Sequence, residues 1–201
     1  MTRLQLNKSS LARETASLQG YRRFLPSLDL KRQQLMTERA NAQRLAAGTS
    51  ADIDELMQRV ARQLPMLADK DIDLSELVTV NGVTLETENV VGTRLPVLAA
   101  VDIRVRRYAL LAKPHWVDNV AALLGTMLEL KLQLQVQRQR VERLDAAVKT
   151  ITQRVNLFDK VLIPRAQANI KRIRIYLSDE EMAAVVRSKI AKRKHAAAAR
   201  S

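Results

Sequence analysis

The C-terminal half of the sequence carries a long seven-residue repeat of apolar residues. Two interleaved series run through it, one from Leu123 to Phe158 and the other from Met127 to Leu162. Eleven of these twelve positions are apolar, and the exception is Gln137. Such spacing over more than four heptads is typical of a left-handed coiled coil, in which a buried polar residue fixes the register. An ordinary amphipathic helix is the alternative, but globular helices seldom keep this repeat for so long.

Two prolines set the expected ends of this helix. Pro114 favours a start near His115, because the first turn of a helix has no partner for the N–H that proline lacks. Pro164 interrupts the repeat, and we expect a kink there. Ser178 with Glu181 three residues later predicts a capping box and a separate short helix over about 179–192. The tail from His195 onward is expected to fray.

The N-terminal half shows a weaker version of the same pattern. One apolar series has a spacing of seven residues and consists of Leu4, Leu11, Leu18 and Leu25. The second apolar position of the heptad is filled from Tyr21 to Ala42, and further apolar residues follow at Leu45, Ile53 and Leu56. We expect a helix over about residues 8–64, with Pro26 bending it or restarting it at Ser27. Its length matches that of 115–176, so each apolar stripe is expected to cover the other in an antiparallel pair.

The region between the two helices has a different pattern. Residues 78–85 form two short β-rich runs around Asn81-Gly82, a pair that accepts the positive φ angles of a type I′ hairpin turn. Residues 101–105 alternate apolar and charged side chains, which fits either a third strand or the start of a helix. Gly92 and Pro96 are expected in the loop between.

The fold class is therefore an all-α dominated one: a long antiparallel two-helix coiled coil with a small β-hairpin in its connecting region. The expected parts are an N-terminal arm (1–65), a connecting region (66–112) with the hairpin at about 78–85, a C-terminal arm (113–177), and a short helix with a basic tail (178–201).

Charge is unevenly distributed along the chain. The net charge is +13, residues 66–96 carry two bases and six acids, and residues 165–201 carry ten bases and three acids. A basic coiled coil that serves as a scaffold or binds nucleic acid is the alternative function; binding to nucleic acid would weaken steeply with salt. The most apolar stretch spans ten residues at 119–128, short of the roughly 20 that cross a membrane.

The sequence contains no motif that carries chemistry. There is no cysteine, there are only two histidines, and no Gly-Lys pair of a phosphate-binding loop occurs. Asp69, Asp71 and Asp73 alternate as in a calcium loop, but the required glycine and distal glutamate are missing. We expect no catalytic residue, cofactor or metal, and we interpret Trp116 as a core anchor.

Several segments resemble the D subunit of the V-type and A-type rotary ATPases. The most specific is RVNLFDKVLIPR at 154–165, and the similarity continues through 169–177 and 183–192. Residues 6–13, LNKSSLAR, are similar to the family's opening. Residues 28–35 are less rich in lysine than the family's usual block, and Ser178 and Ser188 stand where glycines are expected.

The resemblance implies a non-catalytic central rotor shaft that carries torque between a membrane ion-translocating ring and a catalytic hexamer. The implied partners are the catalytic and regulatory subunits of the hexamer, the small F subunit of the stalk, and a funnel-shaped subunit that links to the ring. ATP is made or hydrolysed on the hexamer. The implied location is the cytoplasmic face of the cell membrane, without insertion into it and without bound nucleic acid.

Two sets of residues are candidate partner contacts. Arg165, Lys171, Arg172 and Arg174 form a basic set beside Ile170 and Ile173. This set fits either a solvated face or contact with an acidic partner. Asn81 and Gly82, in acidic surroundings at the other end of the expected helical pair, suit a docking or regulatory contact.

Overall fold

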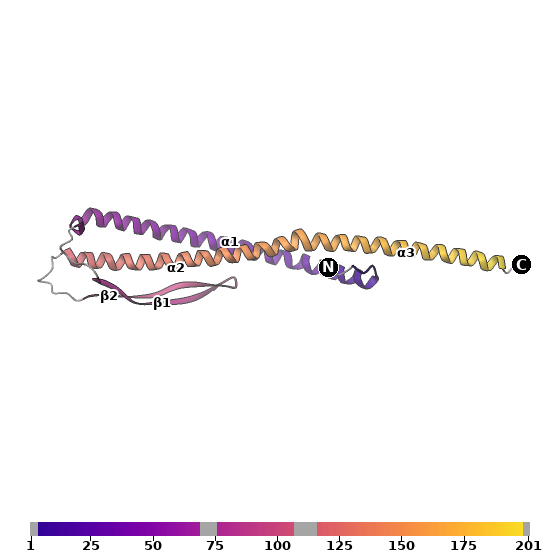
Figure 1. The fold of residues 1–201 in the computed structure, drawn as a ribbon, viewed down its shortest axis with the longest axis horizontal. Helices are drawn as coiled ribbons and strands as arrows, with labels where there is room; N and C mark the ends of the chain where they lie inside the picture. The colour runs from indigo at the N-terminus through magenta and orange to yellow at the C-terminus, as the bar shows by residue number, and fades with distance from the viewer. Residues whose placement is uncertain (1–3, 69–75, 107–115, 199–201) are drawn as a thin grey trace. The chain divides into compact units, whose positions relative to one another are not determined.

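The computed structural model describes residues 4–68, 76–106 and 116–198 (Figure 1). In chain order these residues form helix α1 (Lys8–Gln63), a 3-10 turn (Pro65–Ala68), strands β1 (Val78–Val90) and β2 (Thr93–Val105), helix α2 (Trp116–Leu157), a π-helical segment (Phe158–Leu162) and helix α3 (Ile163–Ala198). The chain divides into two units, residues 31–150 and residues 1–30 with 151–201. The predicted fold class, long paired helices with an antiparallel β-hairpin between them, is confirmed.

Helix α1 begins and ends where local chemistry dictates. The side chain of Asn7 caps its start, since Oδ1 accepts a hydrogen bond of 2.7 Å from the N–H of Ser10. Pro65 follows its end, because proline cannot continue the hydrogen-bonding pattern. The helix passes through Pro26 without the expected restart at Ser27, and the Ser27 hydroxyl instead donates to the carbonyl of Phe24.

In the unit of residues 31–150, α1 and α2 run antiparallel and bury one seam. On α1 the buried positions Leu35, Ala42, Thr49 and Leu56 are seven apart. Leu45, expected in this stripe, is instead 62% exposed, and Thr49 holds the seam position. Arg39 of α1 pairs with Asp145 of α2 at 3.3 Å, which fixes the register of the two helices.

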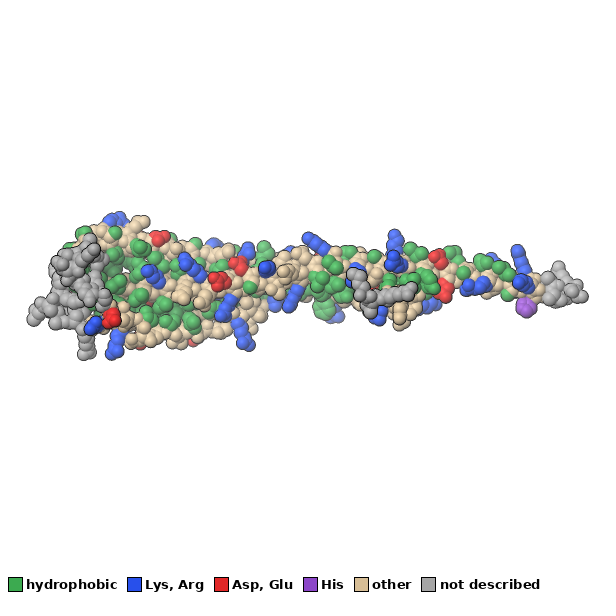
Figure 2. All heavy atoms as spheres, in the orientation of Figure 1, with side chains coloured by type: hydrophobic (Ala, Val, Ile, Leu, Met, Phe, Trp, Pro, Cys, Tyr) green, Lys and Arg blue, Asp and Glu red, His purple; other side chains and the backbone are tan. Residues whose placement is uncertain are grey.

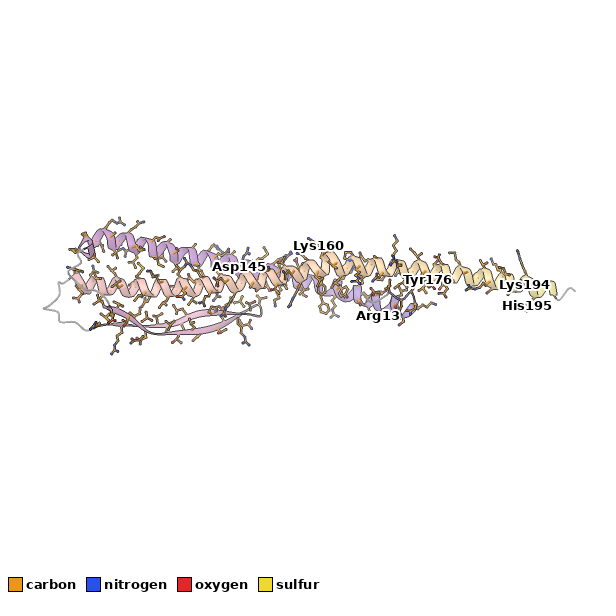
Figure 3. All side chains as sticks on the ribbon, in the orientation of Figure 1. Arg13, Asp145, Lys160, Tyr176, Lys194 and His195 are labelled. Carbon is orange, nitrogen blue, oxygen red and sulfur yellow. The ribbon has the colours of Figure 1, made fainter. Side chains whose placement is uncertain are left out.

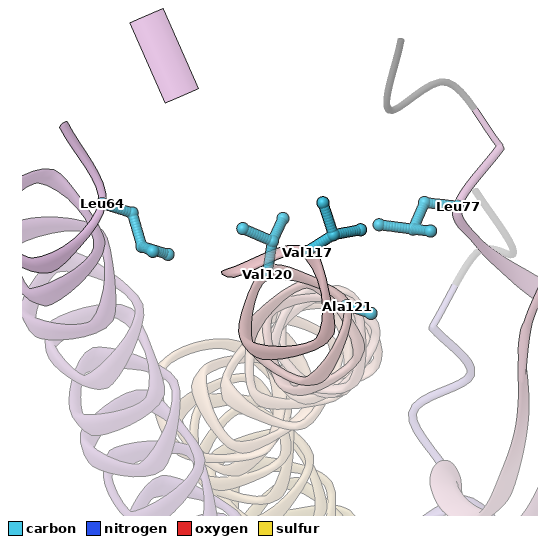
Figure 4. Packing of buried hydrophobic residues seen from close by; sticks show 5 residues of the cluster. All are labelled: Leu64, Leu77, Val117, Val120 and Ala121. Carbon is cyan, nitrogen blue, oxygen red and sulfur yellow. The ribbon is translucent and has the colours of Figure 1, made fainter. Parts of the chain in front are cut away.

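The connecting region of this unit closes around a small apolar cluster (Figure 4). Its buried members come from the residue after α1, the residue before β1 and the start of α2: Leu64, Leu77, Val117, Val120 and Ala121. Trp116 packs against the cluster, as expected of a core anchor, while His115 and Pro114 lie outside the described residues. The N–H of Arg106 donates to the carbonyl of Leu77 and closes the base of the hairpin.

The second unit, residues 1–30 with 151–201, is also an antiparallel helix pair. Three contacts define its register. The rings of Tyr21 and Phe158 meet edge to face at 5.5 Å, Asn169 donates to Glu14 at 3.2 Å, and Lys8 pairs with Glu181 at 3.9 Å. Ala166, Ile170 and Ile173 of α3 are buried in the seam.

A one-residue insertion interrupts the heptads in this unit. The buried positions Ala166 and Ile170 follow Phe158 and Leu162 by eight residues instead of seven. The π-helical segment lies at this point, and the N–H of Ile163 donates to the carbonyl of Phe158, five residues back. A π turn holds one more residue than an α turn, so it keeps the apolar stripe on the seam. Its wider turn also accommodates Pro164, whose ring would clash with the carbonyl four residues back in a regular helix. Lys160 marks the position of the π-helical segment (Figure 3).

The expected break at Ser178 is wrong. Helix α3 continues through Ser178 to Ala198, so Glu181 caps no helix start, and residues 195–198 belong to the helix. Ser and Glu favour a helix start only where the chain changes direction, and here the preceding turns already provide hydrogen-bond partners.

The expected hairpin turn at Asn81-Gly82 is also wrong. Val90 pairs with Thr93, so the turn residues are Val91 and Gly92, whose φ angles are 51° and 80°. Asn81 is instead the extra residue of a β-bulge between the Val80–Ile103 and Gly82–Asp102 pairs. The longer ribbon buries Leu95 completely, and this tertiary packing outweighs the local preference of Asn-Gly for a turn. Pro96 lies within β2, not in a loop.

Deleting Lys160 in a Pro164→Ala background should remove the π turn and move Ile163 into the seam position of Leu162. Relative to that background, the free energy of unfolding should fall by less than about 1 kcal/mol, because the stripe becomes a continuous heptad repeat and no proline ring meets the regular helix. As the matched control in the same background, deleting the exposed Lys131 displaces the seam positions from Leu134 to Leu162 and should cost at least about 4 kcal/mol. Urea unfolding followed by circular dichroism measures both, and equal losses would contradict this account of the π turn.

Candidate partner-binding surfaces

The predicted basic set lies on one helix of the second unit. Arg165, Lys171, Arg172 and Arg174 are all exposed on α3, while Ile170 and Ile173 between them are buried. Among the described residues, no acidic side chain forms an ion pair with any of the four. Lys and Arg side chains stand out from α3 along its length (Figure 2). The set therefore presents unneutralised positive charge, which suits an acidic partner.

The last part of α3 adds apolar side chains to this charge. From Met182 to His195 every side chain except Ala183 is exposed. Met182, Val185, Val186 and Ile190 are among the most exposed large apolar residues that the structure describes. Exposed apolar side chains spaced along a basic helix are typical of a surface that another protein covers. The sequence contained this signal, but the expected separate helix at 179–192 hid its continuity with the basic set.

The predicted pair Asn81 and Gly82 belongs to the other unit, that of residues 31–150. Both residues are exposed, and the bulge that they form lies near the base of the hairpin, on β1. The tip of the hairpin is instead formed by Val91 and Gly92.

Basic side chains of α2 contact the distal part of the hairpin. Arg140 of α2 pairs with Glu88 of β1 at 2.6 Å, and only 22% of the Arg140 side chain is exposed. Arg143 donates to the carbonyl of Arg94 at 3.2 Å. The Arg143 bond is exposed, whereas the Arg140 side chain is mostly covered, and an ion pair shielded from water is stronger than an exposed one. Together with the buried Leu95, these two contacts hold the ribbon against α2 (Figure 1).

A groove of about 510 Å³ lies between β2, α2 and Leu45 of α1. Gln137 lines it, and its side-chain oxygen is buried without a hydrogen-bond partner among the described residues. This is the one polar residue of the predicted heptad series. A buried acceptor without a partner costs free energy, which agrees with the predicted cost of Gln137 in stability, while its role in fixing the register stays a prediction.

The described residues contain no group of three or more His, Asp or Glu side chains placed to hold a metal ion. The predicted calcium-like residues Asp69, Asp71 and Asp73 lie outside the described residues. No helix within the described ranges is long and apolar enough to span a membrane. The basic set and the exposed residues Asn81 and Gly82 stay predictions as partner-binding surfaces.

Comparison with known proteins shows which family the chain resembles along its length. The family model for the D subunit of ATP synthase matches residues 10–193. The V-type ATP synthase D subunit of Borreliella burgdorferi is 32% identical over 192 residues, which cover 96% of this chain and 95% of the relative. The chain belongs to the family of V-type ATP synthase D subunits. The D subunits of Chlamydia trachomatis serovar L2 and Chlamydia pneumoniae are 29% and 28% identical, over 96% and 95% of this chain and 96% and 92% of their own lengths.

Family membership makes the chain a central stalk component of a rotary ATPase, as the sequence resemblance implied, and a non-catalytic subunit of that enzyme complex. The matched region includes both long helices and the hairpin of this D subunit. It also includes all four residues of the basic set. The candidate surfaces are thus parts of the family's shared region.

Replacing the polar seam residue by an apolar one, Gln137→Leu, should stabilise the D subunit. Removing a buried acceptor without a partner and adding apolar contacts should raise the free energy of unfolding by about 1–3 kcal/mol. Gln139→Leu, at an exposed position of the same helix, is the control and should change it by less than about 0.5 kcal/mol. Urea unfolding measures both. A Gln137→Leu protein less stable than the wild type would show that the buried oxygen has a stabilising partner.

Proposed function

We propose that this D subunit is the rotating shaft of the stalk and transmits torque between the membrane ion-translocating ring and the catalytic hexamer. The observation that carries the proposal is that apolar and basic side chains lie on different faces of the paired helices. Apolar residues seal the seam, and the unneutralised bases of α3 lie outside it. A sealed seam resists sliding and unwinding of the two helices, as a shaft requires.

The proposed partners are the catalytic and regulatory subunits of the hexamer, the small F subunit of the stalk, and a funnel-shaped subunit that connects to the membrane ring. The proposed place is the cytoplasmic face of the cell membrane, within a peripheral part of the complex. The family assignment and the near-complete coverage of the relatives support these partners. Asn81 and Gly82 are proposed as a docking contact because both residues are exposed on β1.

The basic set is proposed to contact acidic loops inside the hexamer. Arg165, Lys171, Arg172 and Arg174 offer four positive charges without an acidic neighbour among the described residues. An asymmetric shaft presents these charges unequally to the catalytic interfaces. Unequal contacts bias each interface toward a different conformation, which is how rotation and ATP turnover become linked.

Reversing the four charges of the basic set to glutamate should uncouple ATP turnover from ion pumping in the reconstituted complex. We expect ions pumped per ATP to fall by at least about tenfold, because like charges then face each other across the contact. The control reverses four exposed bases of the other unit, Arg44, Arg62, Lys131 and Arg138, and should leave coupling unchanged. Unchanged coupling in the first variant would rule out the basic set as the contact.

A further inference from the structure

The two strands of the hairpin differ in how much of their surface is covered. In β2, Leu95 and Pro96 are buried, and four further residues are half-buried between Val97 and Ile103. In β1, every residue from Asn81 to Asn89 is exposed. The sheet that the described residues form has two strands, so β1 pairs with β2 along one edge and its other edge carries unpaired backbone groups.

The open edge of β1 has fewer of the features that prevent strand pairing than β2 has. Edge strands are commonly protected by proline, by charged side chains, lysine above all, or by bulges. Strand β2 has Pro96, Arg94 and Arg104, whereas β1 has no proline, lysine or arginine. Its one extra residue, Asn81, lies near the base, and at the second shift in register, between Thr84 and Leu85, the extra residue is Ala99 of β2. The run from Gly82 to Val90 therefore contains no extra residue of β1.

The side chains of this run favour an extended partner. Val83 and Leu85 are two residues apart on one face and are 41% and 52% exposed. On the other face, Glu88 is occupied by Arg140, while Glu86 has no ion-pair partner among the described residues. An added strand could cover Val83 and Leu85 with apolar side chains on one face. On the other face, a basic side chain of that strand could pair with Glu86.

We propose that the outer edge of β1, from Gly82 to Val90, accepts a β-strand from another subunit of the complex. The unpaired backbone groups define the occupant, because only an extended chain can continue the ladder of hydrogen bonds. Self-pairing of two copies is disfavoured, because it brings Glu86 and Glu88 of each copy into one short ladder of like charge. The inference rests on the proposed function, since it requires the assembled stalk.

Hydrogen exchange of the full-length chain, alone and in the affinity-purified complex, tests the proposal. Alternate amides between Gly82 and Val90 should exchange at least about tenfold more slowly in the complex, because only every second N–H points to the outer edge. Amides between Ala100 and Arg104 on β2 should change by less than about twofold, since β2 gains no partner. Uniform protection of all β1 amides would contradict strand addition.

Substitution at the edge provides the second measurement. Leu85→Lys should abolish the protection of β1 in the complex, whereas the control Met57→Lys, at an exposed apolar position of α1, should preserve it. Recovery of an intact complex with unprotected β1 would overturn the strand addition and leave the stalk assignment in place. If the isolated chain dimerises and Leu85→Lys abolishes the dimer, the occupant of the edge is a second copy of this chain. That result would also overturn the proposed pairing with another subunit. Failure of the chain to recover any hexamer would instead refute the proposed function, and this inference with it.

Discussion

Burial of an apolar seam between antiparallel helices is the interaction on which the rest of this protein depends. The helices are too long and too poor in aromatic residues to fold around a globular core. Each unit instead buries one stripe against another, with Leu35 and Leu144 in one unit and Ile170 and Ile173 in the other. Outside the connecting region, burial is limited to this stripe, so most of the remaining helix surface is free for charge and for partners.

Keeping the stripe on the seam requires a specific backbone adjustment. The heptads gain one residue between Phe158 and Ala166, and an uncorrected α-helix would turn Ile170 and Ile173 away from the seam. The π turn at Phe158–Leu162 holds that residue, and Pro164 follows it. The irregularity lies within residues 154–165, a segment whose sequence resembles the family of D subunits and which the family model covers, so we interpret it as a built-in feature of the arm.

The sequence predicted those features that arise from long periodic patterns, and missed those that arise from tertiary packing. The heptads from Leu123 to Leu162 predicted the paired helices, because a stripe of this length has only one way to be buried. Asn81-Gly82 misled the prediction of the turn, because the burial of Leu95 and the Arg140–Glu88 pair favour a longer ribbon. The sequence showed the positive charge of the basic set. Only the structure shows that no acidic side chain among the described residues pairs with it.

The central claim is that two antiparallel arms, fixed in register, work as one shaft. The chain has no cysteine, so introduced pairs report on it directly. We predict that a short bis-maleimide joins Arg39→Cys to Asp145→Cys, and Glu14→Cys to Asn169→Cys, within one chain, because the side chains that these cysteines replace are in contact. It should not join Arg39→Cys to Lys131→Cys, because the α2 positions 131 and 145 lie about 21 Å apart along the helix. Ion pumping by the complex should survive both crosslinks. Absence of the crosslinks, or loss of pumping once they form, would contradict the account.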